Sequence, residues 1–333
     1  MNLKVGLLGG GSWGTTVASL TAKNCPTKIW ARDSATVNDI NQNHRNEKYL
    51  PGAQLTPSLK GCLTIEETVS DADVIVMGIP AQHFRQVLKD ARPHIRPWVP
   101  IISLSKGLEV GSMMRMTEVI EEEMEGHPAG VLTGPNLAKE IVVGQAAASV
   151  IAMVDDTIAK RLQRVFKTGL FRVYTNEDVV GCELGGALKN IVAIAAGMGD
   201  GSGAGENTRA AIITRGLAEL TRLGVAMGGQ PGTFAGLAGM GDLVATCSSE
   251  KSRNRTVGYQ LGLGRKIADI IANMAEVAEG VKTAKVVMDL AKKYDINMPI
   301  AESVYKVLYE NSTARQEFRG LLRMDIGSEA GPG

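Results

Sequence analysis

The hydrophobic positions of the first 180 residues fall in short runs that are separated by polar segments. The runs cover residues 3–8, 28–31, 72–79, 100–104, 129–132, 147–154 and 171–175. Short, near-continuous apolar runs are typical of parallel strands that are buried on both faces. The polar stretch 38–48 predicts a helix and a loop. The pattern as a whole predicts an α/β domain with an open sheet.

A different pattern begins at Val179. Glycine and alanine become frequent, and apolar residues recur at helical spacing, as in Val286, Val287, Leu290, Ala291 and Tyr294. A chain of 333 residues is long enough for two domains. We therefore expect residues 1–180 to form the first domain and residues 181–333 to form a second, mostly helical one. Residues 327–333 are expected to be a frayed tail.

Three glycines follow the first apolar run in the spacing G-x-G-x-x-G. They are Gly9, Gly11 and Gly14, and a helical pattern follows from Thr15. In a dinucleotide-binding loop the first glycine permits the tight turn, the second lets a pyrophosphate approach the backbone, and the third lets the helix pack on the strand. The helix N-terminus then offers N–H groups to the phosphates. An ordinary glycine-rich turn has the same spacing, but the position between a strand and a helix favours a dinucleotide.

The end of the second apolar run bears on the choice of dinucleotide. Many NAD-binding domains place an acidic residue about 20 residues after the glycines, where it accepts hydrogen bonds from the ribose. Here Arg32 stands at the end of the strand and Asp33 follows it. An arginine can bind a 2′-phosphate and stack on adenine, which favours NADP(H). NAD(H) stays an alternative, because a one-residue shift would bring Asp33 to the ribose, and a solvated loop charge is a second interpretation of Arg32.

Composition and charge exclude several function classes. The net charge is +1, so nothing favours nucleic acid or a membrane surface. No uninterrupted apolar run is long enough to span a bilayer, and the N-terminus is occupied by a strand rather than a signal peptide. The cysteines are scattered, which predicts buried reduced thiols, and the histidines do not cluster, so no metal is expected. These features predict a cytoplasmic protein.

Polar or glycine-rich loops follow two of the predicted strands. Lys106 lies in a Ser-Lys-Gly loop after the run 100–104, and Gly134 and Asn136 follow the run 129–132. Ligands of open α/β sheets bind outside the carboxyl ends of the strands. We therefore expect these three residues to converge there.

The second half of the chain contains three polar clusters. Lys189 and Asn190 precede the apolar run 191–198, and Asp242 follows a Gly-Met-Gly segment. The third cluster is basic and rich in donors: Ser252, Arg253, Asn254 and Arg255.

These clusters offer what hydride transfer to a ketone requires, which is a proton donor at the oxygen and, for a phosphorylated substrate, an anion site. Lys189 fits the donor, Asp242 its charge partner, and Arg253 with Asn254 the anion site. Each residue also has a structural interpretation. Lys189 could be a charge at a helix start, Asp242 a cap or turn residue, and Arg253 a surface charge. The residues alone thus indicate a dehydrogenase that accepts a phosphorylated substrate.

A glycine-rich run, Gly199–Gly205, precedes Arg209. Two interpretations stay open. The run could be a mobile substrate loop, or it could be a flexible connection between helices with Arg209 as a structural tie.

Taken in order, these motifs resemble the bacterial-type NAD(P)-dependent glycerol-3-phosphate dehydrogenases over residues 3–320. The segments that carry the resemblance are residues 9–14, 105–107, 134–136, 188–190, 207–211, 241–243, 252–254 and 279–280. The resemblance implies an N-terminal Rossmann-like, doubly wound sheet and a C-terminal all-helical domain, with the site between them. It also implies a cytoplasmic homodimer that reversibly reduces dihydroxyacetone phosphate to sn-glycerol 3-phosphate for phospholipid synthesis.

The resemblance further implies roles for individual residues. Lys189 is the expected proton donor, and Lys106 is expected to touch both cofactor and substrate. The expected substrate-binding residues are Gly134, Asn136, Asp242, Ser252, Arg253 and Asn254, with Arg253 also near the cofactor. The expected cofactor-binding residues, besides the glycine loop, are Ser12, Trp13, Arg32, Ala138, Val277 and Glu279. Position 136 departs from the family, where Ser or Thr is commoner, so its contact is expected through the backbone.

Two other functions compete with this interpretation. One is a two-domain dehydrogenase of a 3-hydroxy acid or a pantoate precursor, which shares the glycine loop and a catalytic lysine. The Arg253-Asn254 pair and the Ser-Lys-Gly loop argue against it. The other is a non-catalytic nucleotide sensor, against which the presence of both Lys189 and Asp242 argues.

Overall fold

The computed structural model describes residues 3–274 and 278–321, and the chain divides into two compact units. The first contains the described residues up to Lys106 together with Met114–Glu183. The second contains Gly107–Met113 and the described residues from Leu184 onward. Compactness does not show that each unit folds alone, so the domain division near residue 180 stays a prediction. The expected tail 327–333 lies outside the described residues.

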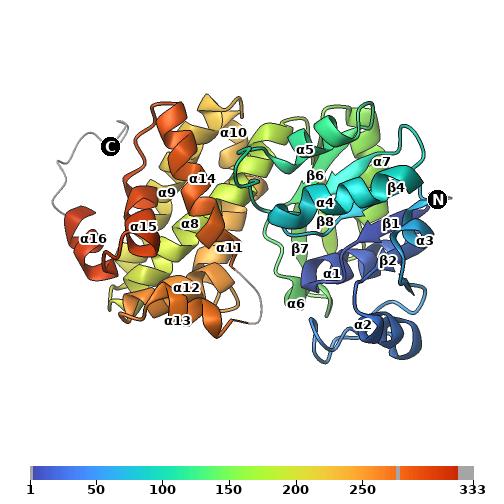
Figure 1. Cartoon of the computed structure of the whole chain (residues 1–333), viewed down its shortest axis with the longest axis horizontal. Helices are drawn as coiled ribbons and strands as arrows, with labels where there is room; N and C mark the ends of the chain where they lie inside the picture. The colour runs from blue at the N-terminus through green and yellow to red at the C-terminus, as the bar shows by residue number, and fades with distance from the viewer. Residues whose placement is uncertain (1–2, 275–277, 322–333) are drawn as a thin grey trace. The chain divides into compact units, whose positions relative to one another are not determined.

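The first unit is built on an eight-stranded sheet among its described residues (Figure 1). Its order is β3-β2-β1-β4-β5-β6-β7-β8, and every neighbouring pair is parallel except β6–β7. The strands are β1 Val5–Leu8, β2 Thr27–Trp30, β3 Lys60–Cys62, β4 Val74–Met77, β5 Ile101–Ser103, β6 Ala129–Thr133, β7 Ala147–Met153 and β8 Phe171–Asn176. Each predicted strand is confirmed, with ends that differ from the prediction by at most two residues. β3 was not predicted, because it is only three residues long and lies at the edge of the sheet.

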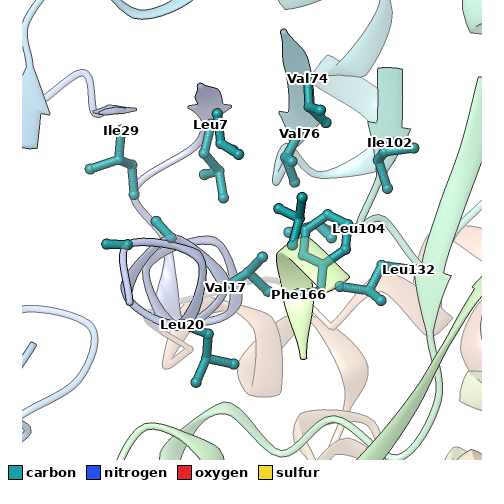
Figure 2. Packing of buried hydrophobic residues seen from close by; sticks show 14 of the residues in the cluster. Leu7, Val17, Leu20, Ile29, Val74, Val76, Ile102, Leu104, Leu132 and Phe166 are labelled. Atoms are coloured by element: carbon teal, nitrogen blue, oxygen red, sulfur yellow. The ribbon is translucent and has the colours of Figure 1, made fainter. Parts of the chain in front are cut away.

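Helices cover both faces of this sheet, and each face has its own apolar core. Alternate residues of a strand point to opposite faces, so Leu7 packs in one core and Leu8 in the other. Figure 2 shows Leu7, Ile29 and Val76 directed towards the helix that carries Val17. The helices over the two faces are, in chain order, α1 Ser12–Thr21, α3 Ile65–Val69, α4 Ala81–Ala91, α5 Met116–Glu123, α6 Ala138–Ile141 and α7 Asp156–Phe166.

Two predicted boundaries in this unit were wrong. The first helix begins at Ser12 rather than at Thr15, because Gly11 is its N-cap and the glycine loop turns directly into the helix. The helix expected within 38–48 begins earlier, as α2 Ser34–Asn38 followed by a π-helical turn η1 Asp39–Asn43. A short 3-10 turn, η2 Arg92–His94, follows α4.

The second unit contains helices and loops but no strand among its described residues, and its first helix, α8, begins five residues before the division at Glu183. Its helices are α8 Val179–Gly201, α9 Glu206–Ala226, α10 Pro231–Phe234, η3 Leu237–Gly241, α11 Asp242–Ser248, α12 Arg253–Gly262, α13 Ile267–Ala272, α14 Glu279–Lys293, α15 Pro299–Tyr309 and α16 Ala314–Leu321. Among the described residues α8 alone is long and apolar enough to cross a membrane. Of its most apolar window, 94% is buried inside the protein, which marks α8 as a core helix.

Glycines set the separation of α8 and α12. A Cβ at Gly197 would collide with the carbonyl oxygen of Arg255, and a Cβ at Gly258 would collide with that of Ile194. One turn further on, Gly201 and Gly262 repeat the pattern against the opposite helix. Small residues four positions apart on both helices allow the two backbones to approach closely. The glycine content of this half therefore reflects helix packing as well as loops.

A buried carboxylate joins α9 to α15. Glu219 accepts hydrogen bonds from the backbone N–H groups of Ile300 (2.8 Å) and Ala301 (3.2 Å) in the first turn of α15. Burial raises the pKa of Glu219 to about 7, against the lowering effect of these two hydrogen bonds. The carboxyl thus titrates near neutral pH while it caps a helix.

The four cysteines are buried and free, as predicted. Burial raises the pKa of Cys247 to about 12 and raises that of Cys182 as well. Both thiols stay protonated at neutral pH and are poor nucleophiles.

Candidate functional site

The glycine loop leaves β1 and enters α1 without an intervening segment. Gly9 has φ +121°, and a Cβ there would collide with the carbonyl oxygen of Gly78, which follows β4. A Cβ at Gly14 would collide with the carbonyl oxygen of Gly9. A Cβ at Gly11, in contrast, would meet no atom within 4 Å. Two glycines therefore close the turn, and the third leaves open space at the start of α1, where helix N–H groups attract anions.

Other candidate residues surround this loop. The Ser12 hydroxyl donates to the carbonyl oxygen of Tyr49 at 3.0 Å. The Trp13 ring packs edge-on against Phe171 at a centroid distance of 6.3 Å. Ala138 is the first residue of α6, and its carbonyl oxygen accepts from the Thr16 hydroxyl at 3.4 Å. The structure thus places the backbones of Ser12, Trp13 and Ala138 around the start of α1.

Arg32 and Asp33 differ in what they can offer a ribose. The Asp33 carboxylate caps α2, where it accepts from the Ala35 N–H at 3.1 Å and from the Thr36 hydroxyl at 3.0 Å. Lys48 lies 3.2 Å from the same carboxylate and, with these hydrogen bonds, lowers the pKa of Asp33. Arg32 is exposed and makes no hydrogen bond or ion pair with a described residue. The arginine is the side chain that remains available.

The loops after β5 and β6 meet, as the strand order predicts. The Lys106 ammonium donates to the carbonyl oxygen of Gly134 at 2.8 Å, and Gly134 has φ +129°. The Asn136 amide nitrogen donates to the Ser149 hydroxyl at 3.2 Å, while its buried Oδ1 has no hydrogen-bond partner in the part of the chain that the structure describes. A buried polar atom without a partner is costly in a folded protein. The Oδ1 of Asn136 is therefore a group to which a ligand could donate.

Lys189 lies in the interior of α8 and not at a helix start, so the structural interpretation of its charge was wrong. Its side chain is 6% exposed. The ammonium donates to the Thr246 hydroxyl at 2.6 Å and lies 3.2 Å from Oδ1 of Asp242, the first residue of α11. The Thr246 hydroxyl in turn donates to the Asp242 carbonyl oxygen at 2.6 Å. A buried lysine is thus held by a carboxylate and a hydroxyl from one helix.

Sequence reasoning missed Thr246. A signal for it exists, because Thr246 lies four residues after Asp242, and residues four apart share a face of a helix. That signal becomes useful only when the intervening segment is known to be helical.

The basic cluster forms the start of α12. Ser252 caps the helix, since its hydroxyl accepts from the Arg255 N–H at 3.3 Å, and Arg253 is the first helical residue. Asn254 is buried: its amide nitrogen donates to Oδ1 of Asn190 at 2.9 Å, and its own Oδ1 accepts from the Gly280 N–H at 3.0 Å. Asn254 therefore ties α12 to α8 and α14.

Asp200, also missed in the sequence, fixes the other side of α12. Its buried carboxylate accepts from Arg255 on α12 (3.0 Å) and from Arg209 on α9 (2.9 Å). The Gly199–Gly205 run is the end of α8 and the connection to α9, with Arg209 as a structural tie, so the second of the two interpretations is supported. Glu279 is the first residue of α14, and Val277 lies outside the described residues.

A mostly parallel sheet with a glycine loop at the N-terminus of α1, followed along the chain by a helical unit with a buried lysine–aspartate pair, is typical of the dehydrogenases that bind a nicotinamide dinucleotide. Two family models match the chain: the NAD-dependent glycerol-3-phosphate dehydrogenase N-terminus over residues 4–159 and the C-terminus of the same family over residues 178–319. The chain belongs to the NAD(P)-dependent glycerol-3-phosphate dehydrogenase family.

Individual relatives agree with this assignment. A glycerol-3-phosphate dehydrogenase (NAD(P)+) of Sphingopyxis alaskensis is 62% identical over 333 residues, which is 100% of both chains. The crystal structure of glycerol-3-phosphate dehydrogenase from Coxiella burnetii superposes with a TM-score of 0.92 at 34% identity, over 97% of this chain and 99% of that one. A ketopantoate reductase of Ralstonia eutropha matches with a TM-score of 0.60 at 14% identity, over 95% of this chain and 100% of that one, which shows a shared fold alone. The pantoate-type alternative has no further support.

Proposed function

We propose that the protein reversibly reduces dihydroxyacetone phosphate to sn-glycerol 3-phosphate with NAD(P)H. The observation that carries this proposal is the buried Lys189 ammonium, which is held at 2.6 Å from Thr246 and 3.2 Å from Asp242 in a chain of this family. The buried pair argues against the sensor, whereas the pantoate-type alternative also has a catalytic lysine and is disfavoured by the match to the glycerol-3-phosphate dehydrogenase models.

The residues of the first unit fit a dinucleotide. The open space at Gly11 and the N–H groups of the first turn of α1 suit a pyrophosphate, which fits the glycine loop with Ser12 and Trp13. We assign Arg32, Lys106 and Ala138 to the same cofactor, together with Arg253, Val277 and Glu279 from residues 181–333. When bound, the reduced nicotinamide supplies the hydride.

Lys189 is the group that we assign as proton donor to the ketone oxygen. A lysine ammonium has three N–H bonds, and Thr246 and Asp242 account for two of them. No other described residue accepts from this ammonium, so the third N–H is the one that we direct at the substrate oxygen. As the alkoxide forms, the nearby positive charge stabilises it and the proton transfers to it. In the reverse reaction the amine takes the proton back.

Asp242 and Thr246 hold the ammonium in one orientation. Both come from α11, so their positions relative to each other are fixed by the helix. Orientation of the donor is a large part of what an enzyme supplies in such a step.

We assign the substrate phosphate to the start of α12. Helix N–H groups, the Ser252 hydroxyl and the Arg253 guanidinium are donors of the kind that phosphates bind. Lys106, Gly134 and Asn136 are assigned to the substrate as well. Since the Asn254 side chain already links two other helices, its second amide hydrogen is the donor that it can offer.

We further propose that the protein prefers NADPH to NADH. The support is that Asp33 is engaged in capping α2 whereas Arg32 is exposed. A 2′-phosphate would give the guanidinium a charge-assisted partner, which a ribose hydroxyl cannot do.

The first experiment is to mix the purified protein with dihydroxyacetone phosphate and follow the loss of absorbance of NADPH and, separately, of NADH. Faster turnover with NADPH supports both proposals. Faster turnover with NADH supports the proposed reaction but contradicts the proposed NADPH preference, and it would assign the ribose contact to Asp33 instead of Arg32. Tight binding of a dinucleotide without turnover of either would overturn the reaction and favour the sensor.

The supply of phospholipid synthesis, the cytoplasmic location and the homodimer are also proposals. They rest on the resemblance and are tested by lipid analysis of a deletion strain, cell fractionation and sedimentation of the purified protein.

A further inference from the structure

One side chain in a polar, exposed stretch is completely buried. Residues 41–48 are exposed or half-exposed except for Asn46, which is 0% exposed. Burial of an amide is unfavourable unless it makes hydrogen bonds. The burial of Asn46 therefore implies hydrogen bonds that compensate for the loss of water around its amide.

The Asn46 amide nitrogen makes two hydrogen bonds, and both reach the glycine loop and the helix that follows it. One goes to the carbonyl oxygen of Gly10 at 2.9 Å, and the other to the hydroxyl of Thr15 at 2.8 Å. Its Oδ1 makes none with a described residue. Among the described residues, the Asn46 side chain thus makes hydrogen bonds only as a donor, and both go to the loop and to α1.

The backbone that carries Asn46 is itself anchored. The carbonyl oxygen of Asn46 accepts from the N–H groups of Tyr49 (3.2 Å) and Leu50 (2.8 Å), and Leu50 lies in the apolar core. The Tyr49 carbonyl oxygen accepts from the Ser12 hydroxyl at 3.0 Å. The segment 46–50 therefore supports the loop at Gly10, Ser12 and Thr15.

We propose that Asn46 is a positioning residue for the dinucleotide: its amide fixes the Gly10 peptide and the start of α1 in the orientation that binds the pyrophosphate. In a trans peptide the C=O of one residue and the N–H of the next point in opposite directions. A hydrogen bond to the Gly10 oxygen consequently fixes the direction of the Gly11 N–H, and a Cβ built on Gly11 would meet open space. This inference rests on the proposed use of a dinucleotide and adds a residue that does not touch it.

The test is a series of dissociation constants, measured without substrate by the fluorescence of NADPH and of NADH on binding. Asn46→Ala should weaken both by the same factor, about tenfold, as expected when two hydrogen bonds of a preorganised loop are lost. The matched control is Asn43→Ala, which removes an exposed amide that donates to Asp39 and should leave both constants within about twofold. Binding of 2′-AMP, which lacks the pyrophosphate bridge, should not change in Asn46→Ala.

A second variant guards against misfolding. Thr15→Val keeps the shape of the residue and removes one of the two acceptors, so it should weaken both dinucleotides about threefold. A residue that merely stabilises the fold would lower the melting temperature and the active fraction but leave the dissociation constants unchanged. Wild-type constants in folded Asn46→Ala, or in Thr15→Val, would overturn the inference.

The outcome is separable from the proposed function. If the unmodified protein binds dinucleotides but does not reduce dihydroxyacetone phosphate, the proposed function fails, while the binding series still decides the role of Asn46. If the unmodified protein binds neither dinucleotide, both proposals are overturned.

Discussion

Replacing Lys189 by methionine tests its assigned catalytic role and its structural role together. Methionine fills a similar volume without the ammonium. The change removes the assigned proton donor and also removes the cation that lies 3.2 Å from the Asp242 carboxylate. Each loss has its own measurable consequence.

The structure sets the size of both effects. The Lys189 and Asp242 side chains are 6% and 3% exposed, so solvent screens the pair weakly. Removing one partner of a buried ion pair costs about 3–5 kcal/mol of stability. Loss of a positioned general acid lowers kcat by roughly 10²–10⁴-fold. Lys189→Met should therefore be both less stable and nearly inactive.

The double variant Lys189→Met/Asp242→Asn distinguishes the two losses. It removes the unpaired carboxylate, so most of the lost stability should return while activity should not. The assays are urea unfolding, turnover of dihydroxyacetone phosphate, and NADPH binding, which should stay within about twofold in all variants because the glycine loop is unchanged. Wild-type turnover in folded Lys189→Met would refute the assignment of the proton donor. A double variant no more stable than the single one would refute the argument from the buried pair.

Three further predictions follow from other parts of the chain. Arg32→Ala should raise the KM for NADPH about tenfold and leave the KM for NADH within about twofold, because only NADPH offers a 2′-phosphate; equal changes would exclude that contact. Burial raises the pKa of Glu219 from 4.5 to about 7, so between these pH values the folded protein keeps a proton that the unfolded chain has lost. The free energy of unfolding therefore falls as the pH rises from 4.5 to about 7. Stability of the wild type minus that of Glu219→Gln should thus fall by roughly 3 kcal/mol between about pH 4.5 and pH 7 in urea unfolding, and a constant difference would show that the carboxyl does not titrate there. Gly258→Val should lower the melting temperature by about 5 °C or more, since its Cβ would collide with the carbonyl oxygen of Ile194; an unchanged melting temperature would show that α8 and α12 can separate without cost.

The sheet could be predicted because its physical signal is local. Strands such as 74–77 are buried on both faces and therefore appear in the sequence as apolar runs. β3 gives no such signal, since Lys60 is exposed and the strand is too short to form a run. The first residue of α1 could not be predicted. Its N-cap is Gly11, which has no side chain to accept a capping hydrogen bond and therefore gives no sequence signal for a helix start.

The candidate site could be predicted only in part. Lys106 and Gly134 were predicted to lie close together, because ligands of open α/β sheets bind outside the carboxyl ends of the strands. The hydrogen bond between the two residues confirms this proximity. Asp242 was predicted as the charge partner of Lys189, and the structure places the two side chains 3.2 Å apart. Thr246, the second partner of Lys189, and Asp200, which holds Arg255, were not predicted, because they come from segments whose packing depends on the whole helical unit. Their roles in binding and catalysis stay predictions.

The glycines of the two units show why composition alone misleads. A high glycine content is typical of flexible segments. In the second half of this chain, however, Gly197 and Gly258 lie in helices and bring α8 and α12 into backbone contact. Lys189 is on α8 and the assigned phosphate site begins α12, so glycines that carry no functional group help to set the distance between the assigned proton donor and the assigned phosphate site. Asp200, three helical turns beyond Lys189, holds Arg255 of α12 and fixes the same pair of helices at a second point. The distance is thus set by packing and by a buried charge, and neither can be read from the residues that we expect to touch the substrate.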